Sequence, residues 1–139
     1  LEMAPIRVYE VATFYTMYNL KPVGKHLVQI CRTTPCWLRG SDGLTDLCKK
    51  KLGVDLHGTS ADGKFTIMEV ECLGACVNAP MVQINDDFYE DLTPESLSKV
   101  LDELAAGRQP KIGPQIDRLN SAPEGGMTTL QDVAKGAGQ

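Results

Sequence analysis

Residues 65–76 read FTIMEVECLGAC, and this stretch decides the fold that we expect. An Asp-Gly turn leads into it, and its apolar and β-branched side chains predict a buried strand over residues 65–71. Cys72 follows the strand directly, and Cys76 comes after three further residues. The sequence therefore predicts two thiols on the loop that leaves one end of a strand.

Residues 27–36 repeat this arrangement. The short apolar run over residues 27–31 predicts another buried strand, which ends at Cys31, and Cys36 follows after four residues. A helix is expected between the two strands, over residues 41–52. Strand–helix–strand units place their strands in parallel with a right-handed crossover, so both strands should end at the same edge of one sheet. Four thiols from two loops then converge at that edge.

The helix expected over residues 41–52 has recognisable ends. Ser41 or Asp42 can cap its start with a side-chain oxygen, and Gly53 can end it. Its apolar face includes Cys48, which we interpret as a small buried hydrophobe and not as a ligand.

A hairpin and a last helix complete the expected core. Residues 82–89 alternate and then turn as a β-hairpin does. The last helix begins with a capping hydroxyl at Thr93, followed by proline, and stops at Gly107. The order strand, helix, strand, hairpin, helix predicts an α/β domain over residues 25–106.

Two segments flank this domain, residues 1–24 and residues 107–139. Residues 6–20 predict a helix that is apolar around its whole circumference, so it should be part of a larger helical unit or packed on another subunit. Because the chain begins with Leu1, we interpret it as a processed or incomplete product. Residues 107–139 hold six glycines and three prolines, and are expected to form a disordered tail or an extended arm along a partner.

Composition argues against several classes of function. The formal net charge is −4 and no basic stripe is present, which disfavours nucleic-acid binding. No apolar run approaches the roughly 18 residues of a membrane-spanning helix, so contact with a membrane is expected only through partners. Five cysteines, an odd number in a chain of 139 residues, are unlike a secreted disulfide scaffold and favour a reducing compartment.

Thiols paired on two loops suit a [2Fe–2S] cluster. Each iron needs two protein thiolates, and the loops have to wind around bulky sulfides, for which Gly74 and Ala75 are small enough. Backbone N–H groups and the hydroxyls of Thr33 and Thr34 can donate hydrogen bonds to sulfur. The alternatives are a structural zinc ion on the four cysteines, two disulfides, or unligated core thiols. Zinc loops usually pair cysteines with two residues between them, which neither pair here does.

Other signals are weaker, and no catalytic residue is predicted. Residues 58–64 nearly match a phosphate-binding loop, but Phe65 stands where Ser or Thr should bind magnesium. His26 and His57 lack the partners for a catalytic pair or a Rieske site, and are expected to have ordinary surface or strand-edge roles. Trp37 is expected to shield a cluster, to contact a partner or simply to pack in the core.

Residues 31–36, CRTTPC, and residues 71–85, ECLGACVNAPMVQIN, resemble one family in spacing and in intervening residues. Residues 9–15, YEVATFY, resemble the last helix of that family's N-terminal bundle. The family is the small thioredoxin-like [2Fe–2S] ferredoxin subunit of respiratory complex I, NADH:ubiquinone oxidoreductase. The resemblance implies an α/β, thioredoxin-like ferredoxin domain, preceded by one helix of an incomplete bundle and followed by an extended C-terminal arm.

The resemblance also implies a cofactor and partners. It assigns one [2Fe–2S] cluster to Cys31, Cys36, Cys72 and Cys76. The chain would be an electron carrier without substrate chemistry, within an H⁺-translocating oxidoreductase. FMN and NADH would bind to a partner flavoprotein subunit, and the large iron–sulfur subunit of the same module would be a second partner. Glu71 is expected to keep the cluster potential low by placing negative charge nearby.

The same resemblance suggests a location and leaves alternatives. It places the chain on the matrix side of the mitochondrial inner membrane, with the cytoplasmic face of a bacterial inner membrane as the alternative. Equivalent subunits of NAD-linked hydrogenases or formate dehydrogenases are the alternative within electron transfer. A zinc-stabilised structural interaction module is the alternative from another class.

Overall fold

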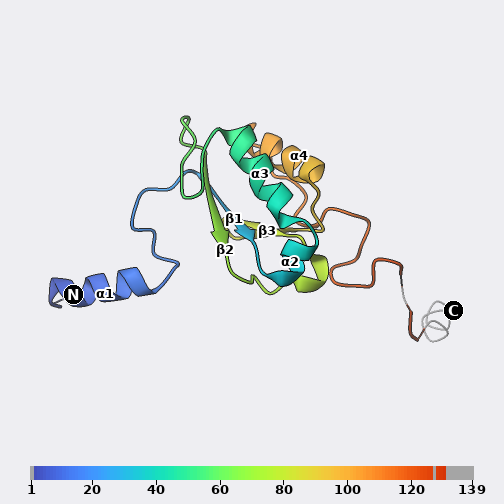
Figure 1. Ribbon diagram of the computed structural model, residues 1–139, viewed down its shortest axis with the longest axis horizontal. Coiled ribbons are helices and arrows are strands. Elements are labelled where there is room, and N and C mark those ends of the chain that lie inside the picture. Colours follow the sequence, from blue (N-terminus) through green and yellow to red (C-terminus); the bar gives the residue numbers. More distant parts are fainter. Residues whose placement is uncertain (1, 127, 131–139) are drawn as a thin grey trace.

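A five-stranded mixed sheet forms the centre of the chain, in a computed structural model that describes residues 2–126 and 128–130 (Figure 1). The strands are β1 (His26–Cys31), β2 (Phe65–Val70), β3 (Val82–Ile84), β4 (Asp87–Glu90) and β5 (Gly113–Pro114). Their order across the sheet is β2-β1-β3-β4-β5, with β2 parallel to β1, β3 antiparallel to β1 and to β4, and β5 parallel to β4.

The parallel pairing of β1 and β2 decides where the functional loops lie. In their register Cys31 is opposite Val70, so the two strands end together. The helix α3 (Ser41–Leu52) joins them as the crossover. The expected strand–helix–strand unit and the hairpin of β3 and β4 are therefore confirmed.

Helix α3 has the predicted bounds but not the predicted cap. Gly40 occupies the cap position in a left-handed conformation, with φ of 94°, and no side chain caps the helix. Ser41 is instead inside the first turn and buried, because a short helix, α2 (Thr34–Leu38), ends just before it. The capping role expected for Ser41 or Asp42 is therefore wrong, whereas Gly53 ends the helix as expected, with φ of 67°.

Helix α4 (Pro94–Ala105) begins as the sequence predicts. The Thr93 hydroxyl accepts a hydrogen bond from the backbone N–H of Ser96, whose own hydroxyl accepts from the backbone N–H of Thr93. This reciprocal pair satisfies two donors that the first turn would otherwise leave free. The helix ends at Ala105, just before the expected stop.

Helices α3 and α4 lie side by side on one face of the sheet (Figure 1). The core between these two layers is apolar and contains Val28, Ile30, Leu44, Cys48, Phe65, Ile67, Tyr89, Leu97, Val100, Leu101 and Leu104. Strand β1 alternates buried and half-buried residues along its first five positions, as expected for a sheet covered fully on one side only.

The N-terminal helix is shorter than expected. Helix α1 (Pro5–Phe14) stops six residues before the predicted end, and none of its residues is buried. Helices of this length gain most of their stability from packing of an apolar face, and no such packing exists here among the described residues. Tyr15 and Thr16 also have modest helix propensity, and the backbone at Tyr15 is already extended, with ψ of 117°.

The C-terminal arm begins on the chain's own sheet. Strand β5 pairs with β4, and Pro110 and Pro114 are buried. The start of the arm therefore pairs with the chain's own sheet, whereas the sequence led us to expect a disordered tail or an arm along a partner. Residues 131–139 lie outside the described part. Within that part, no helix combines the length and apolarity needed to cross a bilayer.

Candidate functional site

The first pair of cysteines lies where β1 ends. Cys31 is the last residue of the strand, and Cys36 is in α2, which the chain enters three residues later. Both side chains are buried, with exposures of 2% and 1%. They belong to a small apolar cluster with Ala79 and Met81, separate from the main core.

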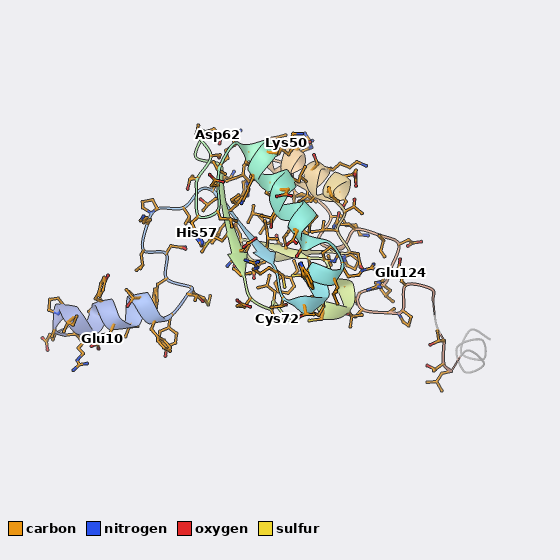
Figure 2. The ribbon with its side chains drawn as sticks, in the orientation of Figure 1. Glu10, Lys50, His57, Asp62, Cys72 and Glu124 are labelled. Carbon is orange, nitrogen blue, oxygen red and sulfur yellow. The ribbon has the colours of Figure 1, made fainter. Side chains whose placement is uncertain are left out.

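The second pair lies where β2 ends. Figure 2 shows Cys72 at the opposite end of the sheet from Asp62. Cys72 and Cys76 are both exposed, and their Sγ atoms are 3.5 Å apart. Gly74 takes a left-handed conformation, with φ of 85°, that brings the loop back on itself. A side chain here would meet no atom within 4 Å, so the requirement for glycine is conformational.

The two loops contact each other through the cluster around Cys31. Leu73 and Ala75, from the second loop, pack against it. The backbone N–H of Leu73 also helps to lower the pKa of the Cys31 thiol. The structure thus brings all four predicted cysteines to one end of the sheet, the first pair in its interior and the second on its surface.

Burial and hydrogen bonds together give each pair one thiol with a lowered pKa and one with a raised pKa. Burial opposes ionisation of Cys31, but donors led by the Thr33 hydroxyl outweigh it and lower its pKa. The pKa of Cys72 is lowered, first by the backbone N–H of Gly74, which is 3.4 Å from its Sγ. Burial raises the pKa of Cys36 to about 12. The pKa of Cys76 is raised, mainly by its hydrogen bond to Cys72.

The Thr33 side chain acts on one thiol of each loop. Its Oγ1 is 3.5 Å from the Cys31 Sγ, and its hydroxyl also lowers the pKa of Cys72. The sequence predicted a donor role for Thr33 and for Thr34; Thr34 is exposed on α2. Backbone N–H donors were also predicted, but only the folded loop shows that Gly74 supplies one and that Leu73 acts on the pKa of Cys31.

Charged and aromatic side chains surround the site at the surface. Arg32 forms an ion pair with Glu69, with a separation of 2.7 Å. Trp37 is 56% exposed and its Nε1 donates to Asp42 at 3.1 Å, so packing of Trp37 in the core is ruled out. Arg39 donates through Nε to the backbone oxygen of Ala79 at 3.4 Å, which ties the first loop to the segment after Cys76.

The thiols can be compared with what a metal group requires. Among residues 2–126 and 128–130, no three His, Cys, Asp or Glu side chains are close enough to hold one metal ion. A binuclear cluster makes a different demand, because two thiolates bind each iron and the four sulfurs need not meet at a point. Two thiol pairs on facing loops, with N–H and hydroxyl donors at the sulfurs, fit that demand.

The remaining candidates are structural. Cys48 is fully buried in the main core, and burial raises its pKa to about 12. His26 packs on Phe65, with ring centroids 5.2 Å apart, whereas His57 is exposed. The segment that resembled a phosphate loop is a turn closed by a 2.6 Å hydrogen bond from Ser60 to Asp62.

Solved structures identify the fold. The chain superimposes on the thioredoxin-like [2Fe–2S] ferredoxin from Aquifex aeolicus with a TM-score of 0.52 and 20% identity, over 63% of this chain and 92% of that one. An NAD⁺-reducing [NiFe]-hydrogenase gives a TM-score of 0.69 at 16% identity, over 76% of this chain and 18% of that one. The chain therefore has a thioredoxin-like ferredoxin fold.

The family follows from the sequence match. The model of the thioredoxin-like [2Fe–2S] ferredoxin family matches residues 1–105, and the chain belongs to this family. It is 65% identical over 104 residues to a subunit of the NADH-quinone oxidoreductase of Rickettsia conorii, covering 75% of this chain and 62% of that protein. It is 52% identical over 134 residues to the mitochondrial NADH dehydrogenase [ubiquinone] flavoprotein 2 of Dictyostelium discoideum, covering 96% of this chain and 54% of that protein. The chain thus spans less than two thirds of these relatives.

Proposed function

We propose that the chain binds one [2Fe–2S] cluster through Cys31, Cys36, Cys72 and Cys76, and carries single electrons in the NADH-oxidising module of respiratory complex I. One observation carries the proposal: the parallel strands β1 and β2 end together, and each leads into a loop with two cysteines. Family membership supports the cofactor, and the names of the Rickettsia and Dictyostelium relatives support the enzyme.

The protein groups at the site suit a one-electron carrier. A bound [2Fe–2S] cluster accepts or releases one electron, and its potential depends on hydrogen bonds to sulfur and on burial. The Thr33 hydroxyl and the backbone N–H of Gly74 lie within hydrogen-bond distance of thiol sulfurs, and the backbone N–H of Leu73 helps to lower the pKa of the Cys31 thiol. Such donors stabilise the added negative charge of the reduced state. Burial of Cys31 and Cys36 keeps water away from the first pair of thiols, whereas the second pair, on the exposed Cys72–Cys76 loop, remains accessible to solvent.

The partners and the location belong to the same proposal. We infer that a flavoprotein subunit with FMN and NADH exchanges electrons with this site, and that the large iron–sulfur subunit is a second neighbour. The site would lie in the peripheral arm, on the matrix side of the mitochondrial inner membrane or the cytoplasmic face of a bacterial one. The division into residues 1–24, 25–106 and 107–139 stays a prediction, with the exposed α1 assigned to an incomplete helical bundle.

Two alternatives make different predictions. An equivalent subunit of an NAD-linked hydrogenase or formate dehydrogenase would carry the same cluster but assemble with other catalytic subunits, and the hydrogenase neighbour shares only the fold. A zinc-stabilised module would bind one zinc ion and remain colourless. Co-purification of the native complex, followed by an assay of NADH-dependent quinone reduction, distinguishes the proposed function from the first alternative. Metal analysis separates the second.

A further inference from the structure

A buried ion pair joins the C-terminal arm to the connection between β4 and α4, next to the loop that carries Cys76. The side chains of Arg118 and Asp91 are 6% and 5% exposed, and Nη1 and Oδ1 are 3.4 Å apart. In every other ion pair of the described residues, at least one partner is more than half exposed. Arg118 Nη1 also donates to the backbone oxygen of Val77, the residue after Cys76, at 3.1 Å.

Asn78 connects this pair to the cysteine loop. It ends the 3₁₀ helix η1 (Cys76–Asn78) and is almost fully buried. Its Nδ2 donates to Asp91 Oδ2 at 3.3 Å and to the backbone oxygen of Asn120 at 2.8 Å. The backbone N–H of Asp91 in turn donates to the backbone oxygen of Asn78 at 2.8 Å. The arm and the connection between β4 and α4 therefore both bond to η1 and hold it in place.

The free energy of burying this network is unfavourable, which argues against stabilisation of the fold as its only role. Burial of two charges carries a desolvation penalty that their attraction only partly offsets. Asn78 Oδ1 and Arg118 Nε are also buried without a hydrogen-bond partner among the described residues. A network of this kind adds little net stability but fixes the positions of the groups that it joins. In Figure 1 the orange arm returns from α4 towards the end of the sheet where β1 and β2 stop. The family match ends at residue 105, so the arm lies outside the matched part of the chain.

We propose that Arg118 is a positioning residue for Cys76: the Arg118–Asp91–Asn78 network fixes η1, and η1 fixes the exposed thiol. The inference rests on the proposed function, in which Cys76 is a cluster ligand. The arm would thus complete the cluster-binding loop from outside the matched domain. A single nitrogen of Arg118, Nη1, contacts both the backbone oxygen of Val77 and Asp91 Oδ1, and Nη2 lies 3.9 Å from Glu124 Oε2.

The test uses the full chain with Arg118→Gln, and Arg108→Gln as the matched control, since Arg108 is exposed and its backbone follows α4. Hydrogen exchange of the metal-free proteins is measured at residues 76–79 and along β1. We expect about tenfold faster exchange at residues 76–79 in Arg118→Gln, with β1 unchanged, and no change in the control. General destabilisation would instead speed exchange in β1 as well, and that result, or exchange within about twofold of the parent at both places, overturns the proposal.

Cluster retention gives the second readout. In the reconstituted proteins, the visible absorbance lost to an iron chelator should decay about tenfold faster in Arg118→Gln than in the parent or in Arg108→Gln. Equal decay rates contradict the positioning role. If Arg118→Gln does not fold, Arg118→Lys keeps the charge on a shorter side chain that reaches Val77 and Asp91 less well, and should show smaller local changes at the same residues. A parent chain without iron and sulfide would refute the proposed function, while the exchange experiment would still test the network.

Discussion

Thr33 offers the sharpest perturbation of the site, because it contacts sulfur without serving as a ligand. Thr33→Val keeps the shape of the side chain and removes the hydroxyl that lies 3.5 Å from the Cys31 Sγ. Thr33 occupies the cap position of α2 but its side chain makes no capping hydrogen bond, so the substitution leaves the helix start intact. The lost donor then affects the cluster and little else.

The expected magnitude follows from the strength of one hydrogen bond. A typical net contribution is ~0.5–1.5 kcal/mol, and the long separation of 3.5 Å places this bond in the lower part of that range. The donor stabilises the reduced state more than the oxidised state, because the reduced sulfurs carry more negative charge. A loss of ~0.5–1 kcal/mol in that difference corresponds to a midpoint potential lower by ~20–45 mV for a one-electron couple.

The assay is a redox titration followed by EPR or visible absorbance. Thr34→Val is the matched control, because Thr34 is the exposed neighbour on α2. We expect the control to keep the parent potential and Thr33→Val to lower it. A rise in potential, or equal potentials for the two variants within about 5 mV, would refute the assigned role of the hydroxyl.

Three further predictions concern the core, pH and charge. Leu101→Ala, at a side chain 1% exposed in the core, should lower the free energy of unfolding by ~2–5 kcal/mol in denaturant titrations, whereas Leu119→Ala, at 77% exposure, should change it by less than ~0.5 kcal/mol. Burial, with help from nearby lysines, lowers the pKa of His26, so the free energy of unfolding that is present above pH 6.5 should fall as the pH drops towards that lowered pKa. His26→Gln should remove this dependence of the unfolding free energy on pH, and a dependence that persists would contradict the assignment. Glu71→Gln should raise the midpoint potential by less than the Thr33 effect, since Glu71 is exposed and water screens its charge; no rise would contradict the expected role.

The sequence was most informative where one local signal was enough. Alternating or apolar runs located β1 to β4, and the capping hydroxyl at Thr93 located α4. The four cysteines were predicted as ligands because pairs of cysteines follow the ends of two expected strands, at Cys31 and Cys72. Family membership then confirmed the thioredoxin-like fold that the motifs suggested.

The sequence was least informative where distant segments decide the result. Nothing local marks β5, which exists because β4 offers an unpaired edge. The buried partnership of Arg118 with Asp91 joins residues far apart in the chain and has no sequence signal. The end of helix α1 was predicted wrongly for the converse reason: its apolar pattern implies packing that the described residues do not supply, and the helix is shorter than that pattern.

The central claim is best tested on the purified chain after anaerobic reconstitution. Iron and acid-labile sulfide are assayed on the same sample that is reduced with dithionite for EPR, with Cys48→Ser as a matched control for a buried cysteine outside the site. The account predicts about two irons and two sulfides per chain and a rhombic S = 1/2 signal, lost in Cys72→Ser and kept in Cys48→Ser. A colourless, EPR-silent chain that binds one zinc ion would contradict it.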